Sequence, residues 1–268
     1  MPNPRRRDRR AQPPSGEHRR PRKPPLVRQV TTLWDYPSQH YGDVEQGSQK
    51  YRGATPSYII WNVVERFTRE GDLVVDPFAG SGTTLDVCQD LGRRCAGFDL
   101  VPAREDIRPA DARSLPLKQR SVDLVFMDPP YADNLSYSDD PRCIGRLPPD
   151  GRYQRAMRLV LGEAWRIMKH GGTLALYVFD VLHASGRRRF FPLGFELFEL
   201  GLDQGFAPID IVAVVRHSRT LELGNYRKAA DHQGFMLRGF GYLLLFSKPL
   251  RDRVGAAESG GRPPKGPC

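Results

Sequence analysis

The chain has 268 residues, of which 39% are hydrophobic, and this is enough for one α/β domain of ordinary size with tails to spare. No uninterrupted apolar segment reaches the length of a membrane span, and no apolar run follows the charged first residues, so neither a membrane span nor a secretory signal is expected. The net charge of +10 lies in the tails, with +8 over residues 1–30, +2 over residues 251–268 and zero between them. The charge therefore predicts no basic surface on the domain itself.

Both tails are rich in Pro, Gly and Arg and poor in apolar residues, so we expect residues 1–30 and 251–268 to be disordered on either side of a single domain, residues 31–250. A polycationic tail attracts polyanions through counterion release without reading their sequence. A tail that tethers DNA and a tail that only keeps the protein soluble both fit this composition.

The four cysteines lie far apart and show neither a CxxC pair nor the His/Cys spacing of a metal site. They are Cys88, Cys95, Cys143 and Cys268. We expect free thiols in a reducing cytoplasm, and we expect no metal site.

Helical and strand patterns alternate from about residue 55 onward, which is typical of a parallel sheet with crossover helices. Thr55 and Pro56 resemble a helix cap followed by a proline in the first turn, and apolar residues then recur at helical spacing up to a stop at Gly71. The next expected elements are a buried strand at 73–76, a glycine turn, a helix at about 83–91, a strand at 95–99 and a weaker strand that ends near residue 107.

The second half of the domain continues this alternation. Its expected elements are a clear strand at 122–127, an amphipathic helix at 153–169, a strand at 173–179, a helix at 195–204 and two last strands at 209–215 and 242–246. The last strand is expected to be antiparallel. Together these elements predict an α/β fold with a doubly wound, mostly parallel seven-stranded sheet of the Rossmann-like kind.

A glycine-rich turn, DPFAGSGTT over residues 76–84, joins the first strand of this sheet to its helix. Doubly wound sheets bind ligands beyond the carboxyl ends of their strands, and the helix offers unpaired N–H groups to an anionic group of the ligand. A dinucleotide-binding turn would need a third glycine where this chain has Leu85, so that class of protein fits less well. Seven residues of the turn are expected to contact the ligand: Asp76, Pro77, Phe78, Gly80, Ser81, Gly82 and Thr83.

Two further acids fit the same ligand. Asp99 ends the second strand, at the distance from the turn that is normal for an acid that binds ribose hydroxyls. Asp111 follows the third strand, where an acceptor for an adenine amino group is expected. A single acid at a strand end is more often a cap or a turn residue, so both assignments depend on the glycine turn.

The tetrapeptide Asp128-Pro129-Pro130-Tyr131 follows the strand at 122–127 directly, and it carries the strongest functional signal in the chain. Here the sequence resembles the amino-methylating DNA methyltransferases, whose catalytic motif is (D/N/S)PP(Y/F). The resemblance runs from about residue 31 to 249. It includes LWDYP at 33–37, YRGATPSYI at 51–59, DPFAGSGTTL at 76–85, DPPYADNLSYSD at 128–139, WRIMKHGGTL at 165–174 and GFGYLLLFSKP at 239–249.

This resemblance implies a class I methyltransferase fold, S-adenosyl-L-methionine as the cofactor and DNA as the partner. An exocyclic amine is a poor nucleophile, and two acceptors aimed at its hydrogens, the Asp128 carboxylate and the Pro129 carbonyl, would free its lone pair. Prolines fix the backbone and remove competing donors, and Tyr131 offers a flat face for a base. The base has to be flipped out of a duplex or already single-stranded to reach such a site.

Several alternatives stay open at this point. The favoured target is the 6-amino group of adenine, because family members that act on the 4-amino group of cytosine more often carry Ser at the first position of the tetrapeptide; an RNA base is a third possibility. A restriction partner and a solitary role are both compatible with the sequence. The segment 217–238 is the best place for target recognition or is an ordinary polar loop, and its candidate DNA contacts are Arg219, Tyr226, Arg227 and Lys228.

Overall fold

The computed structural model describes residues 25–48, 51, 53–134, 137–183 and 189–250. The helices and strands of the first half are β1 (Leu33–Trp34), α1 (Ser57–Phe67), β2 (Leu73–Asp76), α2 (Thr83–Asp90), β3 (Arg94–Asp99), β4 (Arg108–Pro109) and β5 (Val122–Met127). Those of the second half are α3 (Arg152–Ile167), β6 (Met168–Val178), β7 (Val181–His183), β8 (Arg189–Phe191), α4 (Leu193–Asp203), β9 (Ala207–Val215), α5 (Arg219–Glu222), α6 (Gly224–Gln233) and β10 (Phe240–Ser247).

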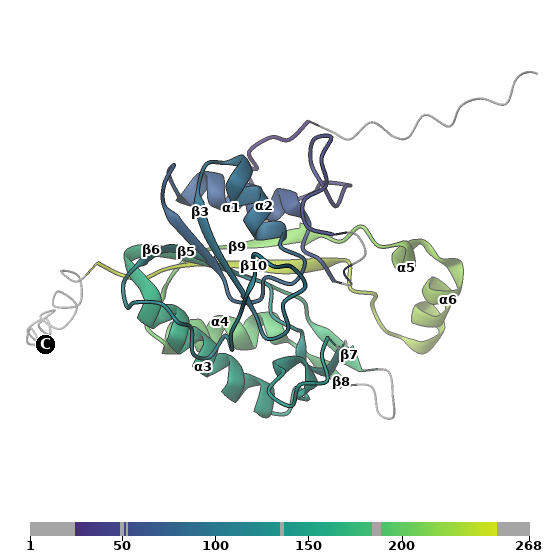
Figure 1. Cartoon of the computed structure of the whole chain (residues 1–268). Coiled ribbons are helices and arrows are strands. Elements are labelled where there is room, and N and C mark those ends of the chain that lie inside the picture. The colour runs from purple at the N-terminus through teal and green to yellow at the C-terminus, as the bar shows by residue number, and fades with distance from the viewer. Residues whose placement is uncertain (1–24, 49–50, 52, 135–136, 184–188, 251–268) are drawn as a thin grey trace, which may run out of the picture.

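An eight-stranded sheet forms the middle layer, in the order β1-β9-β10-β6-β5-β2-β3-β4. Helices α1 and α2 cover one face of this sheet and α3 and α4 cover the other (Figure 1). Neighbouring strands run parallel except at β10, which is antiparallel to both β6 and β9. The doubly wound, mostly parallel α/β fold and its antiparallel last strand are therefore confirmed.

Each face of the sheet has its own apolar core, because successive side chains of a strand point to opposite faces. On β5, Val125 and Met127 pack under α3 and α4, whereas Leu124 and Phe126 pack under α1 and α2. All four side chains are fully buried. A strand covered on both faces needs apolar residues at every position, which explains the nearly unbroken apolar run of this segment.

The number of strands expected from the sequence is wrong. The sheet has an eighth strand, β1, whose two residues lie parallel to Ala213 and Val214 of β9, and β7 and β8 form a separate two-stranded sheet. The expected third strand also differs, since β4 has two residues and begins after Ile107 instead of ending there. Strands of two or three residues are too short to show a period of two in a sequence.

Helix α1 is shorter than expected at both ends. It ends at Phe67 and not at Gly71, because Thr68 is extended and its hydroxyl donates a hydrogen bond to the Val64 carbonyl at 2.6 Å. At the other end the cap residue is Pro56, and Thr55 makes no capping hydrogen bond. The Thr55 side chain has a different partner, described below.

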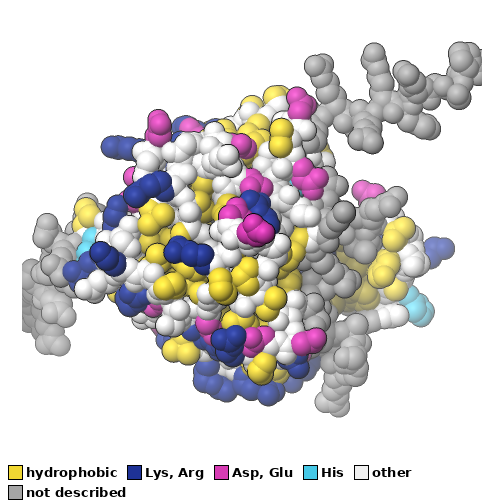
Figure 2. All heavy atoms as spheres, viewed as in Figure 1, with side chains coloured by type: hydrophobic (Ala, Val, Ile, Leu, Met, Phe, Trp, Pro, Cys, Tyr) yellow, Lys and Arg dark blue, Asp and Glu magenta, His cyan; other side chains and the backbone are white. Residues whose placement is uncertain are grey.

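The expected disorder of the tails concerns residues that lie mostly outside the described ranges; of these tails the model describes residues 25–30, which form no helix or strand. None of the described helices is long and apolar enough to cross a membrane. Acidic and basic side chains are spread over the same face of the molecule (Figure 2), as the zero net charge of residues 31–250 leads one to expect.

Candidate functional site

The glycine turn between β2 and α2 is held in place by Asp76, the last residue of β2. One oxygen of its carboxylate accepts a hydrogen bond from the Phe78 N–H at 2.9 Å, and the other accepts one from the Thr84 hydroxyl at 2.5 Å. Gly80 and Gly82 have φ values of 48° and 83°, a backbone region that favours glycine. Burial raises the pKa of Asp76 to about 7. This acid therefore clamps both ends of the turn.

Asp99, at the end of β3, reaches the same turn from the neighbouring strand. Its Oδ2 accepts a hydrogen bond from the Gly80 N–H at 3.0 Å and its Oδ1 accepts one from the Val101 N–H at 3.0 Å. Burial raises the pKa of Asp99, and the backbone N–H groups of Val101, Gly80 and Leu100 lower it. A carboxylate has about four acceptor sites, so Asp99 can also accept a hydroxyl group of a ligand.

Asp111 lies just after β4 and is paired with a neighbour. The Arg113 guanidinium donates to both of its oxygens, at 2.8 and 2.6 Å, and these hydrogen bonds lower the pKa of Asp111. The ion pair fixes the carboxylate at the edge of the cavity next to the turn. The arginine was not among the residues singled out from the sequence, although its place two residues after the acid is a recognisable signal.

A first cavity, here called the turn cavity, opens above these residues. Eight of the nine residues expected to bind a cofactor line it: Asp76, Pro77, Phe78, Gly80, Ser81, Thr83, Asp99 and Asp111. Other residues of its wall include Tyr51, Thr55, Ala110, Asp128, Pro130, Arg142, Cys143 and Ile144. The turn and the two acids that the sequence singled out separately are thus brought together around one cavity.

The ninth residue, Gly82, is not part of the cavity wall, and its contact with a ligand stays a prediction. Arg104 packs on it from outside, so that a Cβ at this position would lie 2.4 Å from an Nη atom of the arginine. The left-handed backbone of Gly82 and the close approach of the arginine both favour glycine here.

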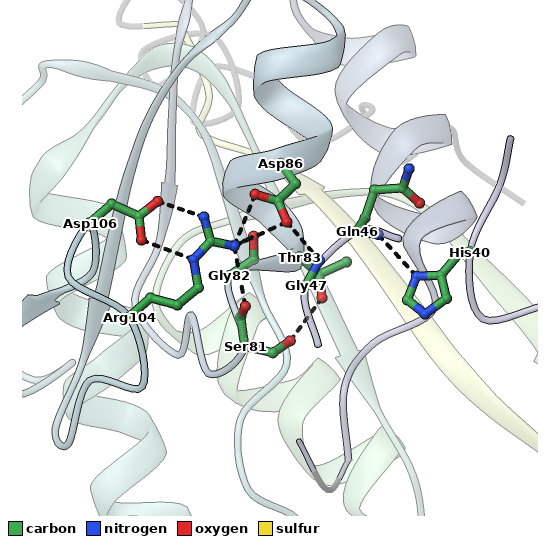
Figure 3. A network of polar contacts seen from close by, with 9 residues as sticks. All are labelled: His40, Gln46, Gly47, Ser81, Gly82, Thr83, Asp86, Arg104 and Asp106. Atoms are coloured by element: carbon green, nitrogen blue, oxygen red, sulfur yellow. Dashed lines mark hydrogen bonds and ion pairs between the residues drawn. The ribbon is translucent and has the colours of Figure 1, made fainter. Parts of the chain in front are cut away.

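Arg104 belongs to a network of polar contacts around the beginning of α2 (Figure 3). Its guanidinium donates to Asp86 of α2 at 2.9 Å and to Asp106 at 2.6 and 2.9 Å. The Gly47 N–H donates to the other oxygen of Asp86 at 2.7 Å, which ties the segment before α1 to the same helix. The network holds the glycine turn in place from outside the cavity. It was not predicted from the sequence because its members lie far apart in the chain.

The Asp128-Pro129-Pro130-Tyr131 tetrapeptide lies beside the glycine turn. It follows β5, which runs parallel to β2 with Val75 opposite Val125, so the two turns begin at neighbouring carboxyl ends of the sheet. Pro130 lines the turn cavity. Pro129 is buried and lines neither of the two cavities described here.

The Asp128 carboxylate is fixed by two hydroxyl groups. Thr55 donates to its Oδ2 at 2.5 Å, and the Tyr131 hydroxyl donates to its Oδ1. Burial raises the pKa of Asp128 to about 7, against the opposite effect of these two hydrogen bonds. Tyr131 is therefore more than a flat face for a base, since its hydroxyl also orients the acid. Thr55, expected to cap a helix, is the functional neighbour that the sequence did not reveal.

A second cavity, here called the aromatic cavity, adjoins the turn cavity. Its wall contains six tyrosine and phenylalanine residues, together with polar residues of the neighbouring loops. The aromatic members are Tyr36, Tyr58, Tyr131, Tyr137, Tyr177 and Phe179. The two cavities share five residues, which are Gly53, Ala54, Thr55, Asp128 and Tyr137. Asp128 therefore faces both spaces.

Phe179 packs edge to face against two tyrosine rings of the second cavity, whereas the Tyr36 and Tyr58 rings are tilted by 32°. The Phe179 ring centroid lies 5.4 Å from that of Tyr131 and 5.2 Å from that of Tyr177, at interplanar angles of 62° and 74°. Tyr36 packs against Tyr58 at 5.0 Å. Such an arrangement makes rigid, apolar walls with a polar end at each tyrosine. The sequence placed Tyr177 and Phe179 only in a strand, because alternation does not say what a side chain faces.

Of the segment expected to recognise the target, the α6 residues lie outside the walls of both cavities, whereas His217, Ser218 and Arg238 line the aromatic cavity. The segment 217–238, expected as a loop, contains α5 and α6, which project from one end of the domain (Figure 1). Arg219 begins α5, and Tyr226, Arg227 and Lys228 are exposed on α6. Neither cavity wall includes the three α6 residues. In the described part of the chain, no three His, Cys, Asp or Glu side chains are placed to hold a metal.

The fold and the site define a class of protein, namely a doubly wound α/β domain with two cavities that meet at one carboxylate. Residues 4–107 match the family model of the DNA methylases, a range that includes the glycine turn and Asp99 and ends before Asp128. Over this range the chain is therefore similar to the DNA methylases.

Individual proteins with matching segments include Type II methyltransferases, and solved methyltransferase structures show a similar fold. The Type II methyltransferase M2.DpnII of Streptococcus pneumoniae is 43% identical over 56 residues, which are 21% of this chain and 21% of that protein. The Type II methyltransferase M.BamHI of Bacillus amyloliquefaciens is 53% identical over 42 residues, 16% of this chain and 10% of that protein. The chain thus spans about a fifth or less of the length of these relatives. A SAM-dependent methyltransferase structure from Methanosarcina mazei is 18% identical, with a TM-score of 0.45, and covers 70% of this chain and 97% of that one.

Proposed function

We propose that this protein transfers the methyl group of S-adenosyl-L-methionine to the exocyclic amino group of a base in DNA, and that its target is the 6-amino group of adenine. The observation that carries the proposal is that Asp128 lies in the wall shared by the turn cavity and the aromatic cavity. A methyl donor in the first cavity and a base in the second would meet at this carboxylate.

The turn cavity has the chemistry that S-adenosyl-L-methionine needs. Asp99 keeps lone pairs for the ribose hydroxyls, and Asp111 is held by Arg113 as an ionised acceptor for the adenine amino group. The hydroxyls of Ser81 and Thr83, 3.1 Å apart, lie where α2 begins and can bind the carboxylate of the methionine part. When bound, the cofactor supplies an electrophilic methyl group on its sulfonium.

The protein orients the target amine and accepts hydrogen bonds from its N–H groups. The Asp128 carboxylate accepts one N–H of the target amine. The second acceptor expected from the sequence, the Pro129 carbonyl, belongs to a buried residue that lines neither cavity. Because the Thr55 and Tyr131 hydroxyls already hold the carboxylate, little reorganisation is needed when positive charge develops on the nitrogen. Asp128 has to be ionised for this role, and its pKa of about 7 ties the reaction to a pH near or above neutrality.

The aromatic cavity suits a purine or pyrimidine base that has left the base stack. Tyr131 and Phe179 offer apolar ring surfaces beside Asp128. A base inside a duplex could not enter it, so the substrate is DNA with a flipped base or single-stranded DNA. We propose in addition that the exposed cations of α6, Arg227 and Lys228, contact the DNA backbone outside the cavity.

We propose adenine and not cytosine as the target base because the tetrapeptide begins with Asp128 and not with serine. Methylated DNA digested to nucleosides and analysed by mass spectrometry tests this choice. We expect 6-methyladenine, whereas 4-methylcytosine alone would end the adenine proposal. Parallel incorporation of labelled methyl groups into duplex DNA, tRNA and rRNA distinguishes DNA from RNA.

The role of Asp128 is tested by the variant Asp128→Ala. We expect it to bind S-adenosyl-L-methionine with nearly wild-type affinity in calorimetric titration, because the anchoring residues of the turn cavity are unchanged. Methyl transfer should fall by about 100-fold or more, as when one group that stabilises developing charge is removed. Undiminished transfer would contradict the proposal, and a wild-type protein that binds no cofactor would contradict it at an earlier step.

A further inference from the structure

Two arginines line the aromatic cavity at the ends of neighbouring strands. Arg216 directly follows β9, and Arg238 comes two residues before β10. The Arg216 N–H donates to the Gly239 carbonyl at 2.9 Å, which holds the two backbone segments together. Both cationic side chains therefore belong to one side of the cavity wall.

Neither guanidinium has an acidic partner among the residues that the structure describes. Arg238 donates from Nη2 to the Met236 carbonyl at 2.8 Å, while its Nε is buried without a hydrogen-bond partner in the described part of the chain. A buried donor without a partner is unfavourable unless a ligand supplies the acceptor. This is the feature that points to a bound group with oxygen acceptors.

The acids nearest to the arginines in the cavity wall are already engaged. Asp180 accepts hydrogen bonds from the Gly194 N–H and the Tyr242 hydroxyl, both at 3.1 Å. Asp128 is held by two hydroxyls, and the remaining cationic candidate, His217, is paired with Asp35 at 2.6 Å. The cavity wall thus keeps two positive charges that its own acids do not pair with in direct ion pairs.

Aromatic rings hold both guanidinium groups in position. The Arg216 guanidinium carbon lies 5.4 Å from the centroid of Phe179, and that of Arg238 lies 5.1 Å from the centroid of Phe190. A ring at this position does not occupy the N–H groups at the edge of the guanidinium plane. Apart from the Arg238 Nη2 that donates to Met236, these groups match the geometry of phosphate oxygens. Phe179 is also a wall of the space beside Asp128.

We infer that the aromatic cavity binds a nucleotide through its phosphate as well as its base, with Arg216 and Arg238 as the phosphate-binding residues. The inference rests on the proposed function and adds a substrate requirement to it. The base lies between the aromatic walls with its amine at Asp128, and a phosphate group of the same strand next to that base lies at the two arginines. A free base or nucleoside lacks this phosphate and is expected to bind poorly.

The test compares Arg216→Gln and Arg238→Gln with the wild-type protein, and uses Arg158→Gln as a matched control. Arg158 lies on α3, is paired with the exposed Asp203 at 3.1 Å and lines neither cavity. The probe is a fluorescein-labelled single-stranded oligodeoxyadenylate, which needs no base flipping, and binding is followed by fluorescence anisotropy at several salt concentrations. Both tails are present in every variant, so their contribution cancels.

Each cavity variant should bind the probe about 10-fold or more weakly, the loss expected for one charge-assisted hydrogen bond. The slope of log affinity against log salt should become shallower by about 0.7, the value for one phosphate contact on a single strand. Arg158→Gln should match the wild type in both. Unchanged cofactor binding in calorimetry shows that each variant is folded.

Wild-type affinity and salt slope in both cavity variants would overturn the inference and leave the proposed function standing. If the wild-type protein itself neither binds the probe nor methylates DNA, the proposed function fails and the inference with it. In a second measurement, deoxyadenosine 5′-monophosphate and deoxyadenosine 3′-monophosphate compete against the probe beside unphosphorylated deoxyadenosine. Equal competition by all three would also overturn the inference.

Discussion

Replacing Thr55 by valine removes a hydroxyl and keeps the shape of the side chain. In the wild-type protein this hydroxyl donates to Asp128 Oδ2 at 2.5 Å and lowers the pKa of the acid, which burial has raised to about 7. A hydrogen bond to a charged group contributes about 1.5–3 kcal/mol, and one pKa unit corresponds to about 1.4 kcal/mol. The pKa of Asp128 in Thr55→Val should therefore rise by roughly one to two units.

The assay is the pH dependence of kcat/KM for methyl transfer. Only the ionised carboxylate accepts the amine, so activity rises with pH through the pKa of Asp128, and the acidic limb of the profile should move upward by roughly one to two units in Thr55→Val. At pH 7 the ionised fraction should fall by roughly 5- to 50-fold, and most of the lost activity should return about two units higher. Thr55→Ser, which keeps a donor, should behave nearly like the wild type.

Two results would refute this reasoning. One is an acidic limb at the same pH in Thr55→Val and the wild-type protein. The other is an equal loss of activity in the valine and serine variants at every pH, which would mean that Thr55 acts only through packing. Cofactor affinity, measured alongside, should stay within about threefold of the wild type because Thr55 is only one of many residues in the wall of the turn cavity.

Two further predictions concern stability. The pKa of Asp128 is raised in the folded protein from 3.8 to about 7, so the folded state binds a proton that the unfolded state has lost, and its ionisation costs stability increasingly between these pH values. Asp128→Asn should therefore match the wild type near pH 4 and be more stable at pH 8, by roughly 4 kcal/mol as an upper bound; equal urea midpoints at pH 8 would contradict this. Gly82→Ala should destabilise the protein by about 1–3 kcal/mol in urea unfolding, because φ is 83° and the new Cβ would lie 2.4 Å from Arg104 Nη1. Its control is Gly224→Ala, where no atom lies within 4 Å of the added Cβ.

The sequence predicted the sheet well where a pattern is local. The strand 122–127 coincides with β5, and the glycine turn and Asp99 lie around one cavity as expected. The partner of Thr55 was not predictable in this way, because Asp128 lies 73 residues further along the chain and the two meet only in the folded sheet. In the sequence, Thr55 resembles the cap of the first helix. Only the folded structure shows that its hydroxyl donates a hydrogen bond to Asp128.

The recognition segment shows the opposite limitation. Arg219, Tyr226, Arg227 and Lys228 have the composition of a DNA contact, but composition does not say where a segment points. The structure places Tyr226, Arg227 and Lys228 on α6, outside the walls of both cavities, while Arg238 at the end of the segment and Arg216 just before it line the aromatic cavity. Arg216 and Arg238 lie next to β9 and β10, and the pairing of these two strands brings them together. This pairing cannot be read from a single sequence.

The wall common to the two cavities links the affinities of their ligands. A methyl donor that packs against Thr55, Asp128 and Tyr137 fixes side chains that an incoming base also has to meet. If the donor changes the affinity for the nucleic acid by some factor, the nucleic acid changes the affinity for the donor by the same factor, since the two binding free energies share one thermodynamic cycle. A change in any of these shared residues is then expected to alter both binding equilibria together.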